Sequence, residues 1–165
     1  MTANLKKLIA MLACDRYMGA LIYGAAGGEQ GVGKSAYLHA FQQKHAGLLI
    51  VYCDVQHTIQ QRDTPALVFD LSPKHLLEWA LSLVPEADLP GLNAVFLDNF
   101  DVVVNLWDAR KKEEFVDRLH RLERVVFPVP VIAMAQEDAV FEQAYQRQQG
   151  ASLRRMIRFR ELETV

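Results

Sequence analysis

The sequence has little cysteine, little net charge and no long apolar run, and each absence excludes a class of protein. Its 165 residues include two cysteines, Cys14 and Cys53, which are far apart and match no metal-ligand spacing. We therefore expect two buried, reduced thiols in a cytoplasmic protein. The five histidines form no HExxH motif. A formal net charge of −2 gives no overall basic field for nucleic acid or an anionic membrane, and no apolar run approaches transmembrane length.

No repeat, low-complexity tract or linker interrupts the chain. With 51% hydrophobic and 23% charged residues, the composition is that of an ordinary globular domain that is large enough to bury a core. We expect residues 1–165 to form a single domain. The opening stretch MTANLKKLIAMLACD resembles a short signal peptide, but its apolar part is too short. Its spacing favours an amphipathic first helix with an apolar face made of Leu5, Leu8, Ile9 and Leu12.

Apolar runs of strand length recur along the chain. The expected strands are residues 19–25, 48–54, 93–99, 129–135 and 156–162. The first four are almost continuously apolar, which is typical of strands covered on both faces of a parallel sheet. The last one alternates between apolar and polar residues, which suits a sheet edge.

Helical patterns lie between the expected strands. One spans residues 34–45, and another begins with Ser72 as its N-cap and Pro73 in its first turn. Two more lie within residues 105–125 and 137–149. The first of these two places four apolar side chains on one face, namely Leu106, Phe115, Leu119 and Leu122. Alternating strands and helices predict an α/β fold, a three-layer α/β/α sandwich with a mainly parallel five-stranded sheet.

A glycine-rich segment follows the first expected strand. Residues 28–35 fit the P-loop pattern G-x-x-x-x-G-K-[ST] without a mismatch. Glycines let backbone N–H groups surround an anion, and the helix that follows adds the positive end of its dipole. Lys34 is predicted to reach the β- and γ-phosphates of a nucleotide, and Ser35 to ligate Mg²⁺. The predicted nucleotide-binding residues are Gly28, Glu29, Gln30, Gly31, Val32, Gly33, Lys34, Ser35 and Ala36.

A second carboxylate is needed to hold the water shell of the metal ion, and Asp98 supplies a candidate. It ends the apolar run 93–99, so it should project from the same edge of the sheet as the glycine-rich segment. We predict that Ser35 and Asp98 hold Mg²⁺ together.

The order of these motifs resembles a known family. GEQGVGKS, followed by AVFLDN and then by VPVIAMAQ, is similar to the P-loop ATPases with an additional strand, in particular the AAA+ and STAND ATPases. The resemblance implies strand order 5-1-4-3-2, a polar sensor at Gln136, and an arginine finger at Arg154 or Arg155. It also implies an ATP-dependent switch or an assembly helper, with DNA transposition or replication as a possible setting. ATP and Mg²⁺ are the implied ligands.

Two departures from the family pattern weaken the prediction of fast hydrolysis. Asn99 stands where the family commonly has a catalytic glutamate, and an amide orients water but does not accept its proton. Asp101 is a substitute, although alternation along an extended strand end would aim it differently from Asn99. The sequence also ends at Val165, soon after the last expected strand, so we expect a minimal core without the small helical lid.

Alternative functions remain open from the residues alone. A nucleotide-binding switch with little intrinsic hydrolysis fits Asn99 nearly as well as an active ATPase does. A GTPase is disfavoured because AQED at residues 135–138 lacks the Asn and Lys of an N-K-x-D motif. A small-molecule kinase would use Asp54 as a substrate-binding acid, with arginines in a lid.

Basic residues gather near the end of the sequence, at Arg147, Arg154, Arg155, Arg158 and Arg160. A solvated face is the ordinary interpretation of such a cluster. The sharper hypothesis makes one of them an arginine finger and lets the others contact a nucleic-acid backbone or an acidic partner. We also expect a protein partner or self-association, and no membrane.

Overall fold

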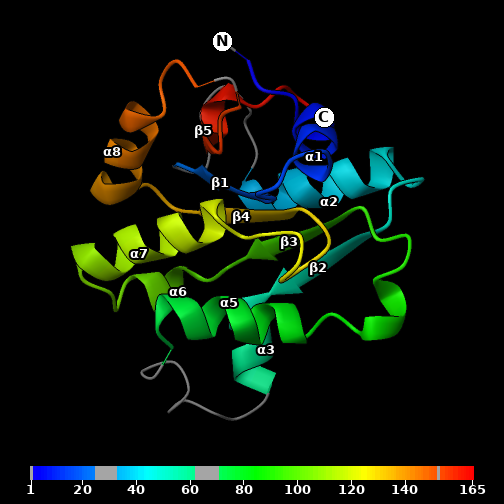
Figure 1. The fold of residues 1–165 in the computed structure, drawn as a ribbon, viewed down its shortest axis with the longest axis horizontal. Coiled ribbons are helices and arrows are strands. Elements are labelled where there is room, and N and C mark those ends of the chain that lie inside the picture. Colours follow the sequence, from blue (N-terminus) through cyan, green and yellow to red (C-terminus); the bar gives the residue numbers. More distant parts are fainter. Residues whose placement is uncertain (1, 25–32, 62–70, 152) are drawn as a thin grey trace.

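One parallel sheet of five strands carries the fold, in the order β2-β3-β4-β1-β5 (Figure 1). Read from the β5 edge, this order is 5-1-4-3-2. The computed structural model describes residues 2–24, 33–61, 71–151 and 153–165. The strands are β1 (Gly19–Tyr23), β2 (Ile50–Asp54), β3 (Ala94–Asp98), β4 (Val131–Ala135) and β5 (Met156–Arg158).

Each expected strand is present and shorter than predicted. Two strands end where the next residue has a positive φ. β1 ends before Gly24, which has a φ of 137°, and β3 ends before Asn99, which has a φ of 54°. β5 pairs only with β1, which confirms the edge position that its alternation predicted. The rest of that predicted run forms the short 3-10 helix η3 (Phe159–Glu161) instead of a strand.

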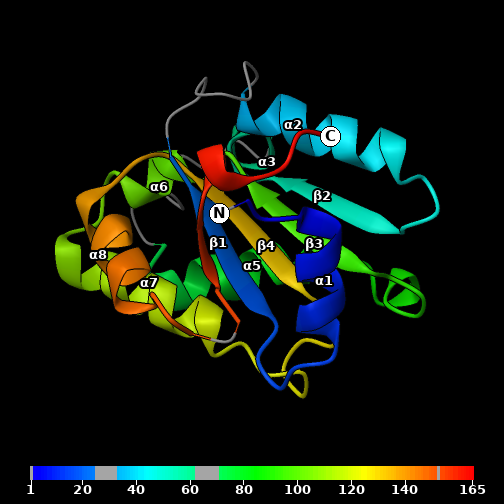
Figure 2. The same ribbon diagram turned by 90° about the horizontal axis from the view of Figure 1, so that it is seen from above.

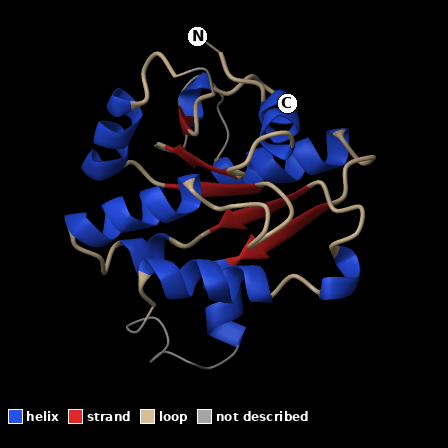
Figure 3. Ribbon diagram, viewed as in Figure 1, coloured by secondary structure: helices blue, strands red, loops and turns tan. Residues whose placement is uncertain are grey.

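Helices cover both faces of the sheet, which makes the three layers visible in Figure 3. α1 and α2 share one core with alternate strand residues, and the other α-helices pack on the opposite face (Figure 2). Because both faces are covered, all five residues of β1, β3 and β4 are buried, as their continuous apolar runs predicted. The helices are α1 (Leu5–Ala13), α2 (Lys34–Lys44), α3 (Val55–Gln61), α5 (Pro73–Ser82), α6 (Asp101–Val104), α7 (Ala109–His120), α8 (Ala139–Arg147) and the 3-10 turn η2 (Glu86–Asp88).

Helix starts follow the capping rules. The Ser72 hydroxyl accepts a hydrogen bond from the backbone N–H of His75, with Pro73 in the first turn of α5, as predicted. Asp108 and Asp138 cap α7 and α8 in the same manner. These caps shorten the two helices relative to the ranges 105–125 and 137–149. The short helices α3 and α6 were not predicted, since neither has the length for a clear apolar period.

Two sequence predictions about burial are wrong. Leu106 is 51% exposed because Asp108 starts α7 after it, so Leu106 lies in a turn and not on the apolar face of the helix. Cys14 is exposed at the C-cap of α1, whereas Cys53 is buried in β2 as expected. Burial raises the pKa of the Cys53 thiol to about 11, with the Asp54 charge adding to the effect.

The first helix confirms its predicted amphipathic character. Its four apolar residues, Leu5, Leu8, Ile9 and Leu12, are all buried in the same core as α2. Across the part of the chain that the structure describes, no helix is long and apolar enough to cross a membrane.

Candidate functional site

The start of α2 stands at the carboxyl edge of the sheet, beside β1 and β3. Gly28, Glu29, Gln30, Gly31 and Val32 lie outside the described residues, whereas Gly33 to Ala36 lie within them. Gly33 is the N-cap of α2 and provides no side chain to cap it. A Cβ built at Gly33 meets no described atom within 4 Å. The first turn of α2 therefore presents backbone N–H groups at this edge of the sheet, an arrangement that suits a phosphate.

Ser35 and Asp98 meet as the sequence predicted. The Ser35 hydroxyl donates a 2.6 Å hydrogen bond to Oδ2 of Asp98, which is the last residue of β3 and only 3% exposed. Tyr52 on β2 donates its hydroxyl to the same carboxylate oxygen. A buried carboxylate with two hydroxyl donors is held in one orientation at the edge of the sheet.

Lys34 turns back toward the end of β1. Its ammonium donates a 2.7 Å hydrogen bond to the carbonyl oxygen of Gly24 and lies 5.8 Å from the centre of the Phe159 ring. Burial lowers the pKa of Lys34, while the charges of Asp101 and Asp98 act in the opposite direction. The half-buried ammonium of Lys34 thus lies between the carboxyl end of β1 and the carboxylates of Asp98 and Asp101.

Asn99 faces away from this cation, toward β2. Its side-chain amide donates a 2.9 Å hydrogen bond to Oδ2 of Asp54. Its backbone carbonyl accepts a hydrogen bond from the backbone N–H of Gln56. Asp54 and Asp98 are register partners in the parallel ladder of β2 and β3. The positive φ of 54° at Asn99 produces this turn, and asparagine tolerates that conformation better than most residues.

Asp101 faces the other way, toward the end of β4. Its Oδ1 accepts a 2.9 Å hydrogen bond from the backbone N–H of Gln136, the residue that follows β4. The side chain of Gln136, the predicted sensor, is exposed. The pKa of Asp101 is raised, mainly because the carboxyl is buried. The hydrogen bond from the Gln136 N–H and the charge of Lys34 act in the opposite direction but do not outweigh burial. The carboxylates of Asp54 and Asp98 therefore lie at the ends of β2 and β3. The Asp101 carboxylate, just after β3, reaches the backbone that follows β4.

The predicted arginine fingers lie at the opposite edge of the sheet. Arg154 and Arg155 precede β5, whereas the phosphate candidates follow β1 and β3. Arg155 makes an ion pair of 3.0 Å with Asp15 and donates to the backbone carbonyls of Tyr17 and Gly19. Its side chain is only 13% exposed. Within one chain, Arg155 is thus engaged in holding the start of β1 and does not reach the candidate phosphate site.

We expect Arg155→Ala to destabilise the fold by about 2–4 kcal/mol, because it removes the charge partner of the Asp15 carboxylate and a donor to two backbone carbonyls. Urea unfolding measures this loss. Arg154→Ala is the control: among the described residues Arg154 lies 5.9 Å from the Tyr145 ring centre, and loss of this contact should cost below about 1 kcal/mol. Unchanged stability of Arg155→Ala, together with lost phosphate release, would instead support the finger hypothesis.

Sequence reasoning missed two residues at the carboxyl edge of the sheet, where the candidate site lies. Tyr52 looked like an ordinary strand residue, and only the parallel ladder places its hydroxyl on Asp98. Arg158 was one arginine among five, yet it ends β5 beside Tyr23, paired with Glu142. The Arg158 hydrogen bond holds the pKa of Glu142 down at about 2, and the Tyr23 hydroxyl lowers it further. The one sequence feature that could have pointed to Tyr52 and Arg158 is their position near the expected carboxyl ends of parallel strands.

A pocket of about 290 Å³ adjoins this edge. It joins Gly24, the acceptor of Lys34, to the Arg158 end of β5. The lining residues are Tyr23, Gly24, Glu137, Glu142, Arg158, Phe159 and Arg160. The pocket therefore supplies space next to the candidate phosphate site.

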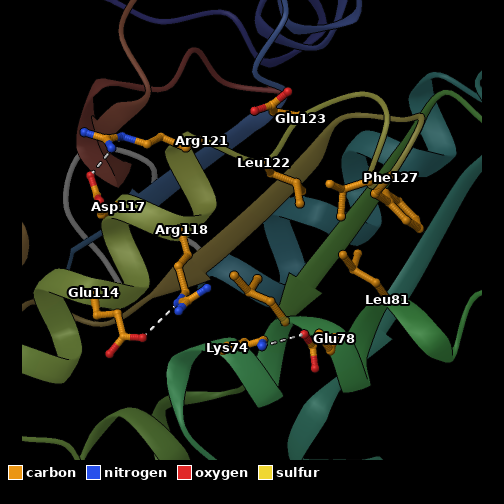
Figure 4. Close-up of a pocket in the computed structure, with 12 residues that line it drawn as sticks. Lys74, Glu78, Leu81, Glu114, Asp117, Arg118, Arg121, Leu122, Glu123 and Phe127 are labelled. Carbon is orange, nitrogen blue, oxygen red and sulfur yellow. Dashed lines mark hydrogen bonds and ion pairs between the residues drawn. The ribbon is translucent and has the colours of Figure 1, made fainter.

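A larger pocket, of about 620 Å³, lies elsewhere, between α5 and α7 (Figure 4). Apolar side chains, among them Leu122 and Phe127, form part of its wall. Its rim carries the ion pairs Lys74–Glu78, Glu114–Arg118 and Asp117–Arg121. None of its lining residues belongs to the edge that holds Lys34 and Asp98.

The donor set at the edge fits a magnesium ion better than a transition metal. In the described ranges, no group of three His, Cys, Asp or Glu residues is arranged to hold a metal ion. Magnesium bound with a nucleotide needs only one or two protein oxygens, because water and phosphate oxygens complete its shell. Ser35 Oγ and Asp98 Oδ2 are such a pair, already 2.6 Å apart.

Comparison of the chain with protein-family models, with curated proteins and with solved structures finds no match. The function therefore rests on the residues and their geometry.

Proposed function

We propose that this protein binds a nucleoside triphosphate with Mg²⁺, ATP by preference, as a P-loop NTPase, and that it hydrolyses the nucleotide. One observation carries the proposal: the Ser35 hydroxyl lies 2.6 Å from the buried Asp98 carboxylate, directly after the motif GEQGVGK. This hydrogen bond joins the serine that ends the motif to an aspartate 63 residues away, which is the pair of oxygen ligands that a P-loop uses to hold Mg²⁺.

The edge of the sheet supplies each part that phosphate binding needs. The N-terminus of α2 would offer backbone N–H groups to phosphate oxygens, and Lys34 would add a positive charge. In the bound state, Lys34 would exchange its Gly24 carbonyl for the β- and γ-phosphates. Ser35 and Asp98 would hold Mg²⁺, which neutralises charge on the phosphates. Tyr52 would keep the Asp98 carboxylate in place.

A nucleotide-dependent switch with slow hydrolysis is the second candidate. The engagement of Asn99 with Asp54 favours it, because the residue after Asp98 is an amide, and the hydrogen bond holds this amide toward β2 and not toward Lys34. In that case a bound γ-phosphate would order the loops near the site and change the affinity for a partner.

Calorimetric titration with ATP and GTP, each with Mg²⁺ and with EDTA, tests the proposal. We expect ATP to bind more tightly than GTP, and Mg²⁺ to strengthen binding. Ser35→Ala should reduce the strengthening by Mg²⁺ at least about tenfold, because one metal ligand is lost. Ser82→Ala is the matched control, since Ser82 only caps the Trp79 carbonyl at the end of α5. Absence of binding by both nucleotides would overturn the proposed function.

A further inference from the structure

The residue after Asp98 is not free to act on a water molecule at a γ-phosphate. The amide of Asn99 is hydrogen-bonded to Asp54, on the β2 side of Asp98. Lys34, which marks the phosphate position, reaches the end of β1, and β1 lies beyond β4 on the other side of β3. Asn99 therefore points away from the phosphate position, and an amide accepts no proton in any case.

Asp54 is also occupied by structural contacts. Its Oδ1 accepts the N–H of His57 at a distance of 2.9 Å, which caps the first turn of α3. Its Oδ2 accepts the amide of Asn99. Asp54 thus stabilises the start of α3 and the turn after β3, on the outer side of the site.

Asp101 lies on the inner side, between the ends of β3 and β4. The 2.9 Å hydrogen bond from the Gln136 N–H fixes its carboxylate there. β4 is the neighbour of β1, so this position faces the strand whose end holds Lys34. Electrostatic coupling between Asp101 and Lys34 agrees with the proximity, and burial raises the pKa of Asp101 toward the range in which a carboxylate is a stronger base.

Asp101 points in a different direction from Asn99, as the sequence analysis expected, but the cause is a turn and not alternation along a strand. β3 ends at Asp98, and the positive φ of Asn99 takes the backbone out of the extended conformation before α6 begins at Asp101. The period of two that applies in a strand does not extend through such a turn. Asp101 consequently returns to the side of the site that Asn99 leaves.

We propose that Asp101 is the catalytic base of this site, taking the role that a glutamate has at the position of Asn99. The proposal rests on the proposed function. The Asp101 carboxylate accepts a proton from a water molecule as the water oxygen bonds to the γ-phosphorus. The bond from phosphorus to the β,γ-bridging oxygen breaks, and its electron pair stays on that oxygen in ADP. Inorganic phosphate leaves, and Asp101 releases the proton to solvent.

Asp101→Asn tests the assignment, because the amide oxygen still accepts the hydrogen bond from Gln136 and the side chain keeps its shape. Phosphate release from Mg²⁺–ATP should fall at least about 100-fold, the ordinary contribution of a general base. Affinity for ATP should stay within about threefold, and the melting temperature should be retained. Asp117→Asn, on the exposed face of α7, is the matched control and should release phosphate at the unaltered rate.

Each other outcome is also decisive. Full phosphate release by Asp101→Asn overturns the assignment, as does a loss confined to Asp54→Asn. Tight ATP binding without phosphate release by the unaltered chain overturns it too and favours the switch. Absence of ATP binding by the unaltered chain rejects the proposed function itself. If Asp101→Asn does not fold, Asp101→Glu replaces it: a retained carboxylate that is displaced by one methylene should keep ATP binding and lose most of the turnover.

Discussion

Replacing Gly19 by alanine is expected to abolish folding, or to lower the free energy of unfolding by more than about 4 kcal/mol. Gly19 begins β1, where the carboxyl end of α7 crosses it. A Cβ at this position would lie 1.8 Å from the carbonyl oxygen of Leu119 and 2.7 Å from its carbonyl carbon. Both are backbone atoms, so no side-chain rotation relieves the overlap.

The position of β1 makes this clash more damaging than one at the surface. β1 is paired on both edges, with β4 and with β5, so it cannot shift without breaking two ladders. α7 is equally fixed, because Phe115 and Leu119 are fully buried beneath it. The expected loss is a large part of the stability of a typical domain, about 5–15 kcal/mol.

Thermal melting followed by circular dichroism measures the effect, and Gly47→Ala is the matched control. Gly47 is exposed between α2 and β2, and an added Cβ meets none of the described atoms within 4 Å. Gly47→Ala should be neutral or stabilising by up to about 1 kcal/mol, because it reduces the freedom of the unfolded chain. A Gly19→Ala variant that melts within a few degrees of the unaltered protein would contradict the packing of α7 on β1.

Lys34→Ala should lower the affinity for ATP at least about 100-fold, since it removes charge-assisted hydrogen bonds worth about 1.5–3 kcal/mol each. The fold should remain, because among the described residues the lost hydrogen bond is the one from the Lys34 side chain to the Gly24 carbonyl. That carbonyl lies just after the end of β1 and outside the strand ladder. Removing a cation from the neighbourhood of Asp98 and Asp101 also leaves two carboxylates uncompensated beside the phosphates.

The shift of the melting temperature by nucleotide gives a clear measurement. A ligand at about 100 times its dissociation constant stabilises the folded state by about 2.7 kcal/mol. The unaltered protein should show this shift with Mg²⁺–ATP, and Lys34→Ala should lose it. Lys44→Ala, in the last turn of the same helix, should keep it. Undiminished ATP affinity in Lys34→Ala would contradict both the role of the lysine and the proposed function.

Much of the fold could be predicted because local and burial patterns agree in this chain. Continuously apolar runs marked β1, β3 and β4, since strands covered on both faces need no polar face. Ser72 with Pro73 marked the start of α5 at the level of single residues. The predictions failed where a turn interrupts a pattern. Leu106 precedes the cap of α7, and the run after Arg158 bends into η3.

The candidate site, too, could be predicted only where a local pattern identifies its residues. The motif ending in Lys34 and Ser35, and the placement of Asp98 at a strand end, could be read in order along the chain. Their meeting is a consequence of parallel strands, whose carboxyl ends share one edge. The sides to which Asn99 and Asp101 turn could not be read, because one residue with positive φ decides them.

The sequence by itself determined the periodicity, the caps and the glycine-rich motif of this protein, because each depends on neighbours within a few residues. The tertiary structure alone decided which strand ends face each other. It places the Tyr52 hydroxyl on Asp98, the Asp54 carboxylate on Asn99, and Arg155 at the edge away from Lys34. These contacts join residues far apart in the chain, and they follow from strand order and packing, which no local pattern encodes.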